Sequence, residues 1–226
     1  MIMDKVALAE RYQQVKATIP SHVKLIAVSK TRSVEEIQAL YDLGHRAFGE
    51  NYPQELRDKQ PLLPADIEWH FIGHLQTNKV KYIAPFVHLV HTVDGPKVLD
   101  ELQKRAHTAE RMIDVLVQVN IAQEETKHGL DQNEANALLS HWDVARWPLL
   151  RVRGLMGMAT NSADMTQVAA EFHGLATFFR AMQASNQVDP AVFTEMSMGM
   201  SGDATTAIAA GSTMVRIGTA IFGERA

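Results

Sequence analysis

The sequence predicts an α/β protein, a single (β/α)₈ barrel with an extra helix at its N-terminus, and three observations support this fold class. The chain has 226 residues, a length that one α/β barrel commonly uses. Short apolar, β-prone runs alternate with helix-like stretches, a pattern typical of parallel strands joined by right-handed crossovers. Eight such runs can be distinguished, and eight strands close this barrel. We therefore expect one domain over residues 1–226.

The elements follow in a regular order. Leu8, Tyr12, Val15 and Ile19 fall at helical spacing and predict the N-terminal helix. The predicted strands are Lys24–Val28, Ala47–Gly49, Ile67–Ile72, Val87–Thr92, Ile113–Val119, Val152–Met156, Phe193–Ser197 and Met214–Ile217. The predicted helices between and after them are 33–44, 52–60, 76–85, 95–111, 131–142, 164–184 and 202–211. An open, doubly wound sheet is the alternative, but no GxGxxG follows the first strand.

Composition narrows the classes of partner. Lysine and arginine total 22 and aspartate and glutamate total 26, a net charge of −4 without a dense basic block. A nucleic-acid partner or an anionic membrane is therefore not expected. The absence of cysteine excludes disulfides, thiolate metal sites and cysteine nucleophiles. The N-terminal stretch is charged throughout and matches neither a signal peptide nor a membrane span, so a cytoplasmic location is expected.

Lys30 stands where the first predicted strand stops. Active sites of such barrels lie at the carboxyl ends of the strands. An arbitrary lysine there is most often only a solvent-exposed strand terminator. In a barrel mouth, however, partial desolvation can lower the pKa of the amine, which can then attack an aldehyde and form a Schiff base. Lys30 is therefore a candidate nucleophile toward a carbonyl compound.

Small residues follow the last two predicted strands. In "SMGMSGD" Ser201 precedes a predicted helix, and in "RIGT" Gly218 and Thr219 follow the eighth strand. Loops after strands seven and eight often bind phosphate in these barrels, although glycines and serines are also ordinary turn and cap residues. A carbonyl-reactive lysine beside a phosphate site favours pyridoxal phosphate (PLP) over a sugar phosphate.

Several motifs in order resemble the pyridoxal-phosphate homeostasis protein family. They are "AVSKTRS", "FGENYPQE", "WHFIGHLQTNK", "GLMGM", "SMGMSGD" and "VRIGTAIFG", and the resemblance runs from about Val23 to Gly223. It implies the barrel of fold-type III PLP enzymes such as alanine racemase, without their second, β-rich domain. One departure is "ETKHG" at 125–129, where many members carry "KSG"; it is expected to leave the pocket unaffected.

The resemblance also assigns site residues. It implies that Lys30 holds the cofactor as an aldimine, that Asn51 lies near the ring substituents and that Arg216 faces the pyridine nitrogen. It implies phosphate contacts from the residues of the last two loops, with further pocket lining beside them: Ser201, Gly218 and Thr219, and then Ser197 and Met198. Methionines 156, 158, 196, 198 and 200, spaced two apart, are expected to line the barrel interior and mouth.

Arg216 bears on the choice of function. A guanidinium stays protonated and donates to the pyridine nitrogen, which leaves the ring a poor electron sink. The function implied is therefore a non-enzymatic carrier that buffers PLP or delivers it to apo PLP enzymes, as a monomer. The alternative is a PLP-dependent racemase or lyase of the alanine racemase type, for which Tyr52 and Tyr82 are the only nearby candidate bases. A Schiff-base aldolase is a distant third.

No metal is expected. His70 and His74 are four apart, but they flank a strand end and no HExxH motif is present. Packing and loop contacts are the expected roles of both residues.

Overall fold

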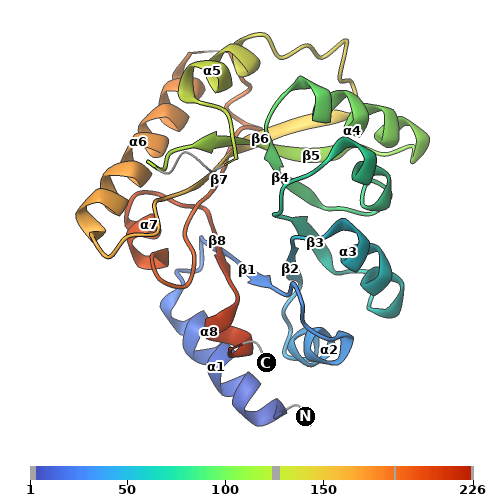
Figure 1. The fold of residues 1–226 in the computed structure, drawn as a ribbon, viewed down its shortest axis with the longest axis vertical. Helices are drawn as coiled ribbons and strands as arrows, with labels where there is room; N and C mark the ends of the chain where they lie inside the picture. The colour runs from blue at the N-terminus through green and yellow to red at the C-terminus, as the bar shows by residue number, and fades with distance from the viewer. Residues whose placement is uncertain (1–3, 124–127, 186, 225–226) are drawn as a thin grey trace.

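The computed structural model, which describes residues 4–123, 128–185 and 187–224, is a closed barrel of eight parallel strands in chain order (Figure 1). The predicted fold class is confirmed. Residues 125–127 of the departing "ETKHG" segment lie outside the described residues. The strands are β1 (Lys24–Val28), β2 (Ala47–Glu50), β3 (Glu68–Phe71), β4 (Leu89–Val93), β5 (Ile113–Asn120), β6 (Leu150–Met158), β7 (Glu195–Ser197) and β8 (Met214–Ile217).

Helices cover the outside of the barrel. They are α1 (Lys5–Thr18), α2 (Val34–Asp42), α3 (Pro53–Lys59), α4 (Pro96–Thr108), α5 (Gln132–Ser140), α6 (Met165–Ala184), α7 (Ala204–Ala209) and α8 (Thr219–Phe222), with 3₁₀ turns η1 (Gln60–Leu62) and η2 (Thr77–Tyr82). Local sequence sets several starts: Asp4 caps α1, while Ser33 with Glu36 and Asp131 with Glu134 form capping boxes.

Two predictions about helices were incomplete. Within the predicted helix 76–85, Thr77–Tyr82 folds as the 3₁₀ turn η2, and the N–H of the following Ile83 donates to the carbonyl of Val80, three residues back. The short helix α8 follows β8 directly, where only a loop was expected. Its four residues are too few to show helical periodicity in a sequence.

Side-chain alternation along the strands divides the core. Two large apolar clusters lie between the sheet and the helices, and a small one fills the barrel interior with Leu89, Leu116, Met156 and Met214. Met156 and Met158 thus face inward as predicted, but Met196 and Met198 pack outward among the side chains of α6 and α7. The prediction was wrong for these two, because a period of two fixes alternation but not which face is inward.

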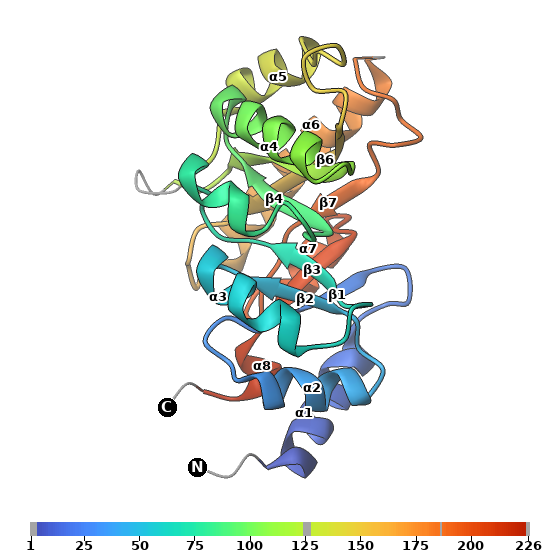
Figure 2. The same cartoon turned by 90° about the vertical axis from the view of Figure 1, so that its right-hand side faces the viewer.

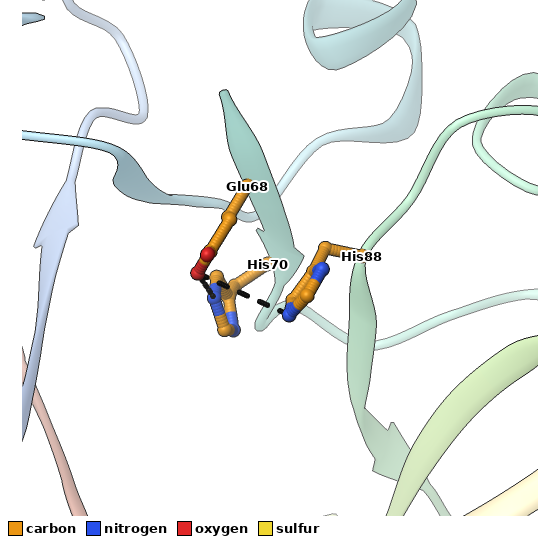
Figure 3. Close-up of side chains that lie close together, drawn as sticks. All are labelled: Glu68, His70 and His88. Atoms are coloured by element: carbon orange, nitrogen blue, oxygen red, sulfur yellow. Dashed lines mark ion pairs between the residues drawn. The ribbon is translucent and has the colours of Figure 1, made fainter. Parts of the chain in front are cut away.

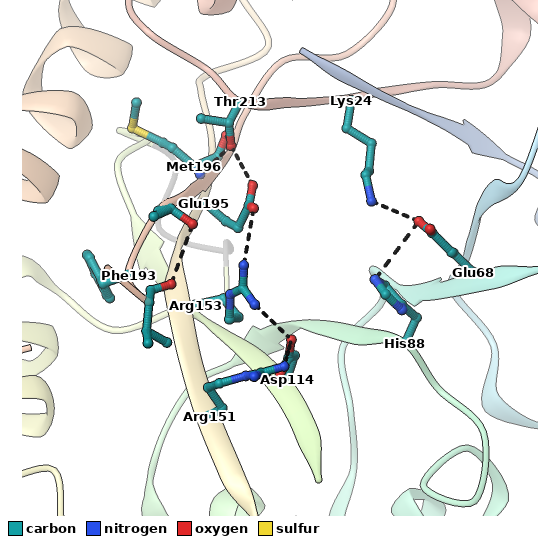
Figure 4. A network of polar contacts seen from close by, with 12 residues as sticks. Lys24, Glu68, His88, Asp114, Arg151, Arg153, Phe193, Glu195, Met196 and Thr213 are labelled. Carbon is teal, nitrogen blue, oxygen red and sulfur yellow. Dashed lines mark hydrogen bonds and ion pairs between the residues drawn. The ribbon is translucent and has the colours of Figure 1, made fainter. Parts of the chain in front are cut away.

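Charged side chains close the amino-terminal end of the barrel, which we call the bottom. Figure 4 shows Lys24, Glu68, Asp114, Arg153 and Glu195 projecting from different strands. Lys24 Nζ lies 2.8 Å from Glu68 Oε2, while Arg153 lies 3.4 Å from Asp114 and 3.6 Å from Glu195. Strand starts meet at one end of a parallel barrel, and charges of opposite sign therefore pair there.

The N-terminal helix packs against the last helix of the chain. Figures 1 and 2 both show α1, α2 and α8 together at one side of the barrel. Arg11 Nε donates to the carbonyl oxygen of Ile221 at 2.9 Å, and Leu8 and Tyr12 are buried. Burial of the Leu8 side chain contributes about 1.5–3 kcal/mol. Among the described residues, no helix is both long enough and apolar enough to cross a bilayer.

Candidate functional site

Lys30 follows β1 at the carboxyl-terminal end of the barrel, which we call the mouth, and is partly buried. The residue before it is held from two sides. The Ser29 hydroxyl donates to Glu50 Oε1 at 2.6 Å, and Lys59 Nζ donates to the Ser29 carbonyl at 2.9 Å. Lys59 Nζ is also 2.9 Å from Glu50 Oε1, so a buried ion pair fixes the chain just before Lys30.

The residue after Lys30 is also held. Thr31 has φ 62°, a left-handed conformation that costs a non-glycine residue about 1 kcal/mol or more. Its N–H donates to Glu55 Oε1 at 2.6 Å, and the same oxygen is 2.5 Å from Lys59 Nζ. The backbone on both sides of Lys30 is therefore anchored to Lys59 and its two carboxylates.

Burial raises the pKa of Glu50, and the adjacent Lys59 opposes that rise. Glu50 is fully buried, and its Oε2 accepts no hydrogen bond from the described residues. Glu50 and Lys59 therefore act on Lys30 through the backbone. Sequence reasoning missed them, although the i, i+4 spacing of Glu55 and Lys59 on α3 was a usable signal.

Asn51 lies beside Lys30 because β2 pairs in parallel with β1, with Val28 opposite Gly49. Its side-chain Oδ1 is buried and has no hydrogen-bond donor among the described residues. A hollow over the ends of β2 and β3 is lined by Asn51, Gly73 and their neighbours. A buried amide oxygen without a donor costs free energy unless a ligand supplies one.

Gly73 allows the chain to approach Asn51 closely. A Cβ on Gly73 would lie 2.2 Å from the backbone oxygen of Asn51, which is closer than any real contact. The Thr92 hydroxyl donates to the Gly73 carbonyl at 2.5 Å and fixes this loop from the side of β4. The Gly73 position therefore requires glycine, and its role is to place the backbone of Asn51.

The predicted phosphate residues lie in two loops at the mouth. Ser201 is exposed in the turn before α7, and Gly218 and Thr219 begin α8. The pairing of β8 with β1, with Ile217 opposite Ala27, brings Gly218 and Thr219 to the same end as Lys30. Since α7 has six residues and α8 has four, hydroxyls and single N–H groups are more useful to an anion there than a helix dipole.

One negative charge lies beside these loops. Asp203 Oδ1 accepts the Met200 N–H at 2.5 Å. This bond occupies one N–H of the loop and leaves the carboxylate close to Ser201, so the anion contacts must come from the other donors.

Arg216 is buried on β8 and points into the barrel. Its Nη1 donates to Ser197 Oγ at 2.6 Å, and its Nη2 donates to the Gly157 carbonyl at 3.1 Å. Burial lowers the pKa of Arg216 to about 10, so the side chain stays charged at neutral pH. It forms no ion pair with a carboxylate of the described residues. A buried cation in this state is costly unless an anion or acceptor joins it.

Ser197 and Met198 differ in direction although they are adjacent. Ser197 is fully buried inside the barrel and bonds Arg216. The Met198 side chain lies in the outer apolar cluster with Phe172 and Ala207. The structure thus brings Ser197 to Arg216 but does not bring the Met198 side chain to them, which leaves only the Met198 backbone for a pocket contact.

Two buried histidines extend this group, and sequence reasoning gave neither of them a role in the site. His91 Nδ1 lies 2.9 Å from Ser197 Oγ, and His91 Nε2 lies 2.9 Å from His70 Nδ1. Burial lowers the pKa of His70 to about 4 and that of His91 well below its ordinary value. His74 is separate from them, since its ring stacks on His128 at a centroid distance of 4.2 Å and lies 3.4 Å from Asp94.

The two tyrosines considered as bases have different surroundings. Tyr52 is 53% exposed before α3 and lines the hollow beside Asn51. The Tyr82 ring instead faces the cationic groups of Arg57, Lys79 and Lys81 at 4.9–5.7 Å. The structure therefore places Tyr52, but not Tyr82, in the hollow that contains Asn51.

Glu68, His70 and His88 form a group of possible metal ligands at the bottom, with donor atoms within 4.8 Å of one another (Figure 3). Glu68 Oε2 lies 3.9 Å from Nε2 of each ring. Lys24 already binds the same carboxylate oxygen at 2.8 Å. The Lys24 ammonium at that distance would repel a metal ion, so we do not assign a metal site to this group.

The mouth residues fit an anionic, acceptor-rich cofactor. Arg216 supplies a buried positive charge, Asn51 a buried acceptor, and Ser201 and Thr219 hydroxyls at the rim. Lys30 supplies an amine between the Asn51 loop and the Thr219 loop. PLP carries an aldehyde, a hydroxyl, a ring nitrogen and a phosphate, which match these groups in kind.

Comparisons with known proteins agree with this geometry. The family model for the alanine racemase N-terminal domain matches residues 3–226. A curated relative, the pyridoxal phosphate homeostasis protein of Vibrio alginolyticus, is 42% identical over 221 residues, which cover 95% of this chain and 92% of the relative.

Solved structures give the same result. The PipY protein of Synechococcus elongatus PCC7942, solved without PLP, aligns with a TM-score of 0.88 at 33% identity and covers 96% of this chain and 100% of its own. The same protein with PLP bound aligns at 0.85, with 32% identity and the same coverage. Alanine racemase from Bartonella henselae shares the fold at a TM-score of 0.75 and 16% identity, over 98% of this chain but 60% of the racemase.

Proposed function

The chain belongs to the alanine racemase N-terminal domain family, and its curated relatives are pyridoxal phosphate homeostasis proteins; from this premise we propose that it binds PLP at the barrel mouth and serves PLP homeostasis. The PLP-bound structure of the PipY relative supports the choice of cofactor. The single observation on this molecule that carries the proposal is Arg216, a buried cation without a carboxylate partner among the described residues.

Each site residue has a proposed role. Lys30 would hold the cofactor through its amine, and the chemistry that PLP would supply there is a reactive aldehyde, which condenses with an amine and releases water. The Arg216 guanidinium would donate a hydrogen bond to the ring nitrogen of the cofactor. Asn51 Oδ1 would accept a hydrogen bond from a donor close to the ring hydroxyl. Ser197 holds Arg216 in place from within the barrel.

The phosphate belongs at the loops after β7 and β8. Ser201 and Thr219 offer hydroxyls, and Gly218 lets the chain pass close to β1, where a Cβ would lie 3.2 Å from the Val28 side chain. Arg32 Nη2 bonds the Gly223 carbonyl, and Arg11 bonds that of Ile221, so both arginines hold α8. The position of Thr219 is thus determined by contacts outside the mouth.

The protein acts as a carrier or buffer of PLP and not as an enzyme. Curated relatives that it matches at about 40% identity are named pyridoxal phosphate homeostasis proteins. Arg216 stays protonated and leaves the ring nitrogen without a proton, which weakens the cofactor as an electron sink. We further propose that residues 1–226 are one PLP-binding unit that acts as a monomer in the cytoplasm and supplies apo PLP enzymes.

The test of binding is a visible spectrum of the purified protein with and without added PLP, followed by borohydride reduction and peptide mapping. We expect an absorbance band of the lysine-bound cofactor and a reduced adduct on the peptide that contains Lys30. A reduced adduct on another lysine would reject the site, and no band at any PLP concentration would reject the function.

The racemase or lyase alternative is tested on the same preparation. Loaded protein is incubated with a panel of L- and D-amino acids, and both chirality and keto-acid formation are followed. Beside it, transfer of PLP to an apo PLP enzyme is measured as regained activity. We expect transfer without turnover, whereas turnover near the roughly 10 s⁻¹ typical of enzymes would favour the alternative.

A further inference from the structure

A continuous line of buried polar side chains crosses the barrel interior behind Arg216. Arg216 on β8 contacts Ser197 on β7 at 2.6 Å, Ser197 contacts His91 on β4 at 2.9 Å, and His91 contacts His70 on β3 at 2.9 Å. All four residues are at most 4% exposed. We refer to these residues as the interior chain. Their lining of the lumen follows from strand alternation, because Val215, Met196, Val90 and Phe71 point outward.

Counting the hydrogens on each group shows which atom donates and which accepts in every hydrogen bond of the interior chain. A guanidinium can only donate, so Ser197 Oγ accepts from Arg216. The hydroxyl hydrogen of Ser197 is then available to His91 Nδ1. To accept it, this nitrogen must carry a lone pair and no hydrogen. Burial keeps both histidines neutral, so each ring carries one N–H. His91 therefore donates from Nε2 to His70 Nδ1, and His70 carries its hydrogen on Nε2.

The far end of the interior chain favours the same direction. His70 Nε2 faces Glu68 Oε2 at 3.9 Å and makes no hydrogen bond with the described residues. An N–H pointing toward a carboxylate is attracted to it, whereas a ring lone pair would be repelled. The opposite direction would also deprive the Ser197 hydroxyl of its acceptor. Both rings are thus Nε2–H tautomers, and every bond is directed from Arg216 toward the bottom.

We propose that His91 and His70, acting through Ser197, are positioning residues that orient the Arg216 guanidinium as a donor to the ring nitrogen of the cofactor. This inference rests on the proposed function. Two N–H groups of Arg216 are bound by Ser197 and the Gly157 carbonyl, and the rigid fork then fixes the direction of the others. Because Ser197 donates onward to His91, its oxygen becomes a stronger acceptor for Arg216.

The first measurement needs no cofactor. The side-chain nitrogens of ¹⁵N-labelled protein are examined by NMR, with His91→Asn and His70→Asn used to assign the signals. We expect both rings to be neutral with the hydrogen on Nε2 at neutral pH. A hydrogen on Nδ1 of either ring would reverse the direction of the interior chain and overturn the proposal.

The second measurement compares PLP with the analogue in which carbon replaces the ring nitrogen. Dissociation constants for both are measured with the unaltered protein and with His91→Leu. We expect His91→Leu to weaken PLP about tenfold, the effect of roughly one hydrogen bond to a charged group, and to leave the analogue nearly unchanged. Equal weakening of both ligands would show a merely structural role and overturn the proposal.

Two further variants separate a positioning role of His91 from a general loss of stability. His45→Leu removes another buried, neutral histidine, which bonds Tyr12 and the Ala47 carbonyl outside the interior chain. It should lower stability without changing the ratio of the two dissociation constants. His91→Asn keeps an acceptor near the Nδ1 position and should restore most of the preference for PLP, even if His91→Leu does not fold. An equally weak His91→Asn would contradict the proposal.

Failure of the proposed function would look different. If the unaltered protein bound neither ligand, the carrier function and the positioning role would both fall, while the tautomers would still report whether the interior chain is directed as inferred. If PLP bound normally but the ratio did not change in His91→Leu, only the positioning role would fall.

Discussion

The two ends of the barrel use the same kinds of side chain in opposite ways. At the bottom, Lys24 pairs with Glu68, and Arg153 pairs with both Asp114 and Glu195 (Figure 4). Among the described residues, the Nε of Arg153 and the Nε2 of His70 are buried there without a hydrogen-bond partner. At the mouth, the buried guanidinium of Arg216 forms no ion pair with the described carboxylates.

This difference separates structural charges from binding charges. The attraction within an ion pair already offsets part of the desolvation cost of each charge. A paired charge therefore contributes little further free energy to ligand binding. Arg216 donates hydrogen bonds to Ser197 and Gly157, which are neutral acceptors, and its one carboxylate attraction, to Asp203, acts without a direct ion pair. The same residue type is therefore part of the closure of the barrel at one end and part of a ligand site at the other.

The largest effect is expected at the mouth. Lys30→Ala should abolish the visible band of the lysine-bound cofactor while the melting temperature stays nearly unchanged, because a partly buried mouth lysine contributes little core packing. Lys79→Ala, on the neighbouring η2 turn, is the matched control and should keep the band. A persistent band in Lys30→Ala would place the covalent link elsewhere.

Lowering the pH should destabilise the protein through its buried histidines. Burial lowers the pKa of His45 and His70 to about 4 and also lowers that of His91, whereas the unfolded value is about 6.5. These residues therefore contribute stability that is fully present above pH 6.5 and is lost as the pH falls toward 4. The free energy of unfolding from urea titrations should fall by several kcal/mol over this range.

One carboxylate opposes this trend. The raised pKa of Glu50 favours the folded state at low pH, and this contribution is lost as the pH rises above about 4.5. Since at least three histidines act in the other direction, stability should still decrease with acid, and His45→Leu should reduce the slope. An unfolding free energy that did not change between pH 6.5 and 4 would contradict the burial of neutral rings.

A bottom variant should affect stability alone. Asp114→Ala leaves Arg153 with one partner and Arg151, which lies 2.7 Å from the same carboxylate, without that partner. Because both arginines are partly exposed, we expect a loss of about 1–2 kcal/mol in urea unfolding. The affinity for PLP should stay within twofold. A large change in affinity would show that the bottom also supports the ligand site.

The smallest effects are expected at the phosphate loops. Thr219→Ala and Ser201→Ala should each weaken PLP by about 1–2 kcal/mol in equilibrium titration, as for one hydrogen bond to a charged group, without changing stability. Thr205→Ala, which changes a hydroxyl on α7, is the control. An unchanged affinity in both variants would move the phosphate away from these loops.

The sequence was sufficient to predict the barrel and the strand ends, because parallel strands place all their carboxyl ends at one face. Lys30, Gly218 and Thr219 could be grouped for that reason, whereas the role of Asn51 came from the family resemblance. It was not sufficient for the contact between His91 and Ser197, which lie 106 residues apart and meet across the lumen. No local periodicity reports which inward side chains meet there.

Strand phase and short helices caused the other errors. The outward direction of Met198 depends on β7, a strand of three residues in which alternation has no apolar face to identify it. The ion pair of Lys59 with Glu50 was also missed, since a lysine on a surface helix is usually solvated. Its burial became evident only when α3 was placed against β2.

The packing of α1 on α8 has a consequence for how the molecule is assembled. Arg11 and Ile221 are 210 residues apart, and β1 pairs with β8, so the first and last elements close the barrel on each other. Contacts of such sequence separation slow folding, and during synthesis they must wait until α8 has left the ribosome. Lys30 is made early, but Arg216 and Thr219 join it only at closure. A nascent chain thus carries the reactive amine long before it can select a ligand for it.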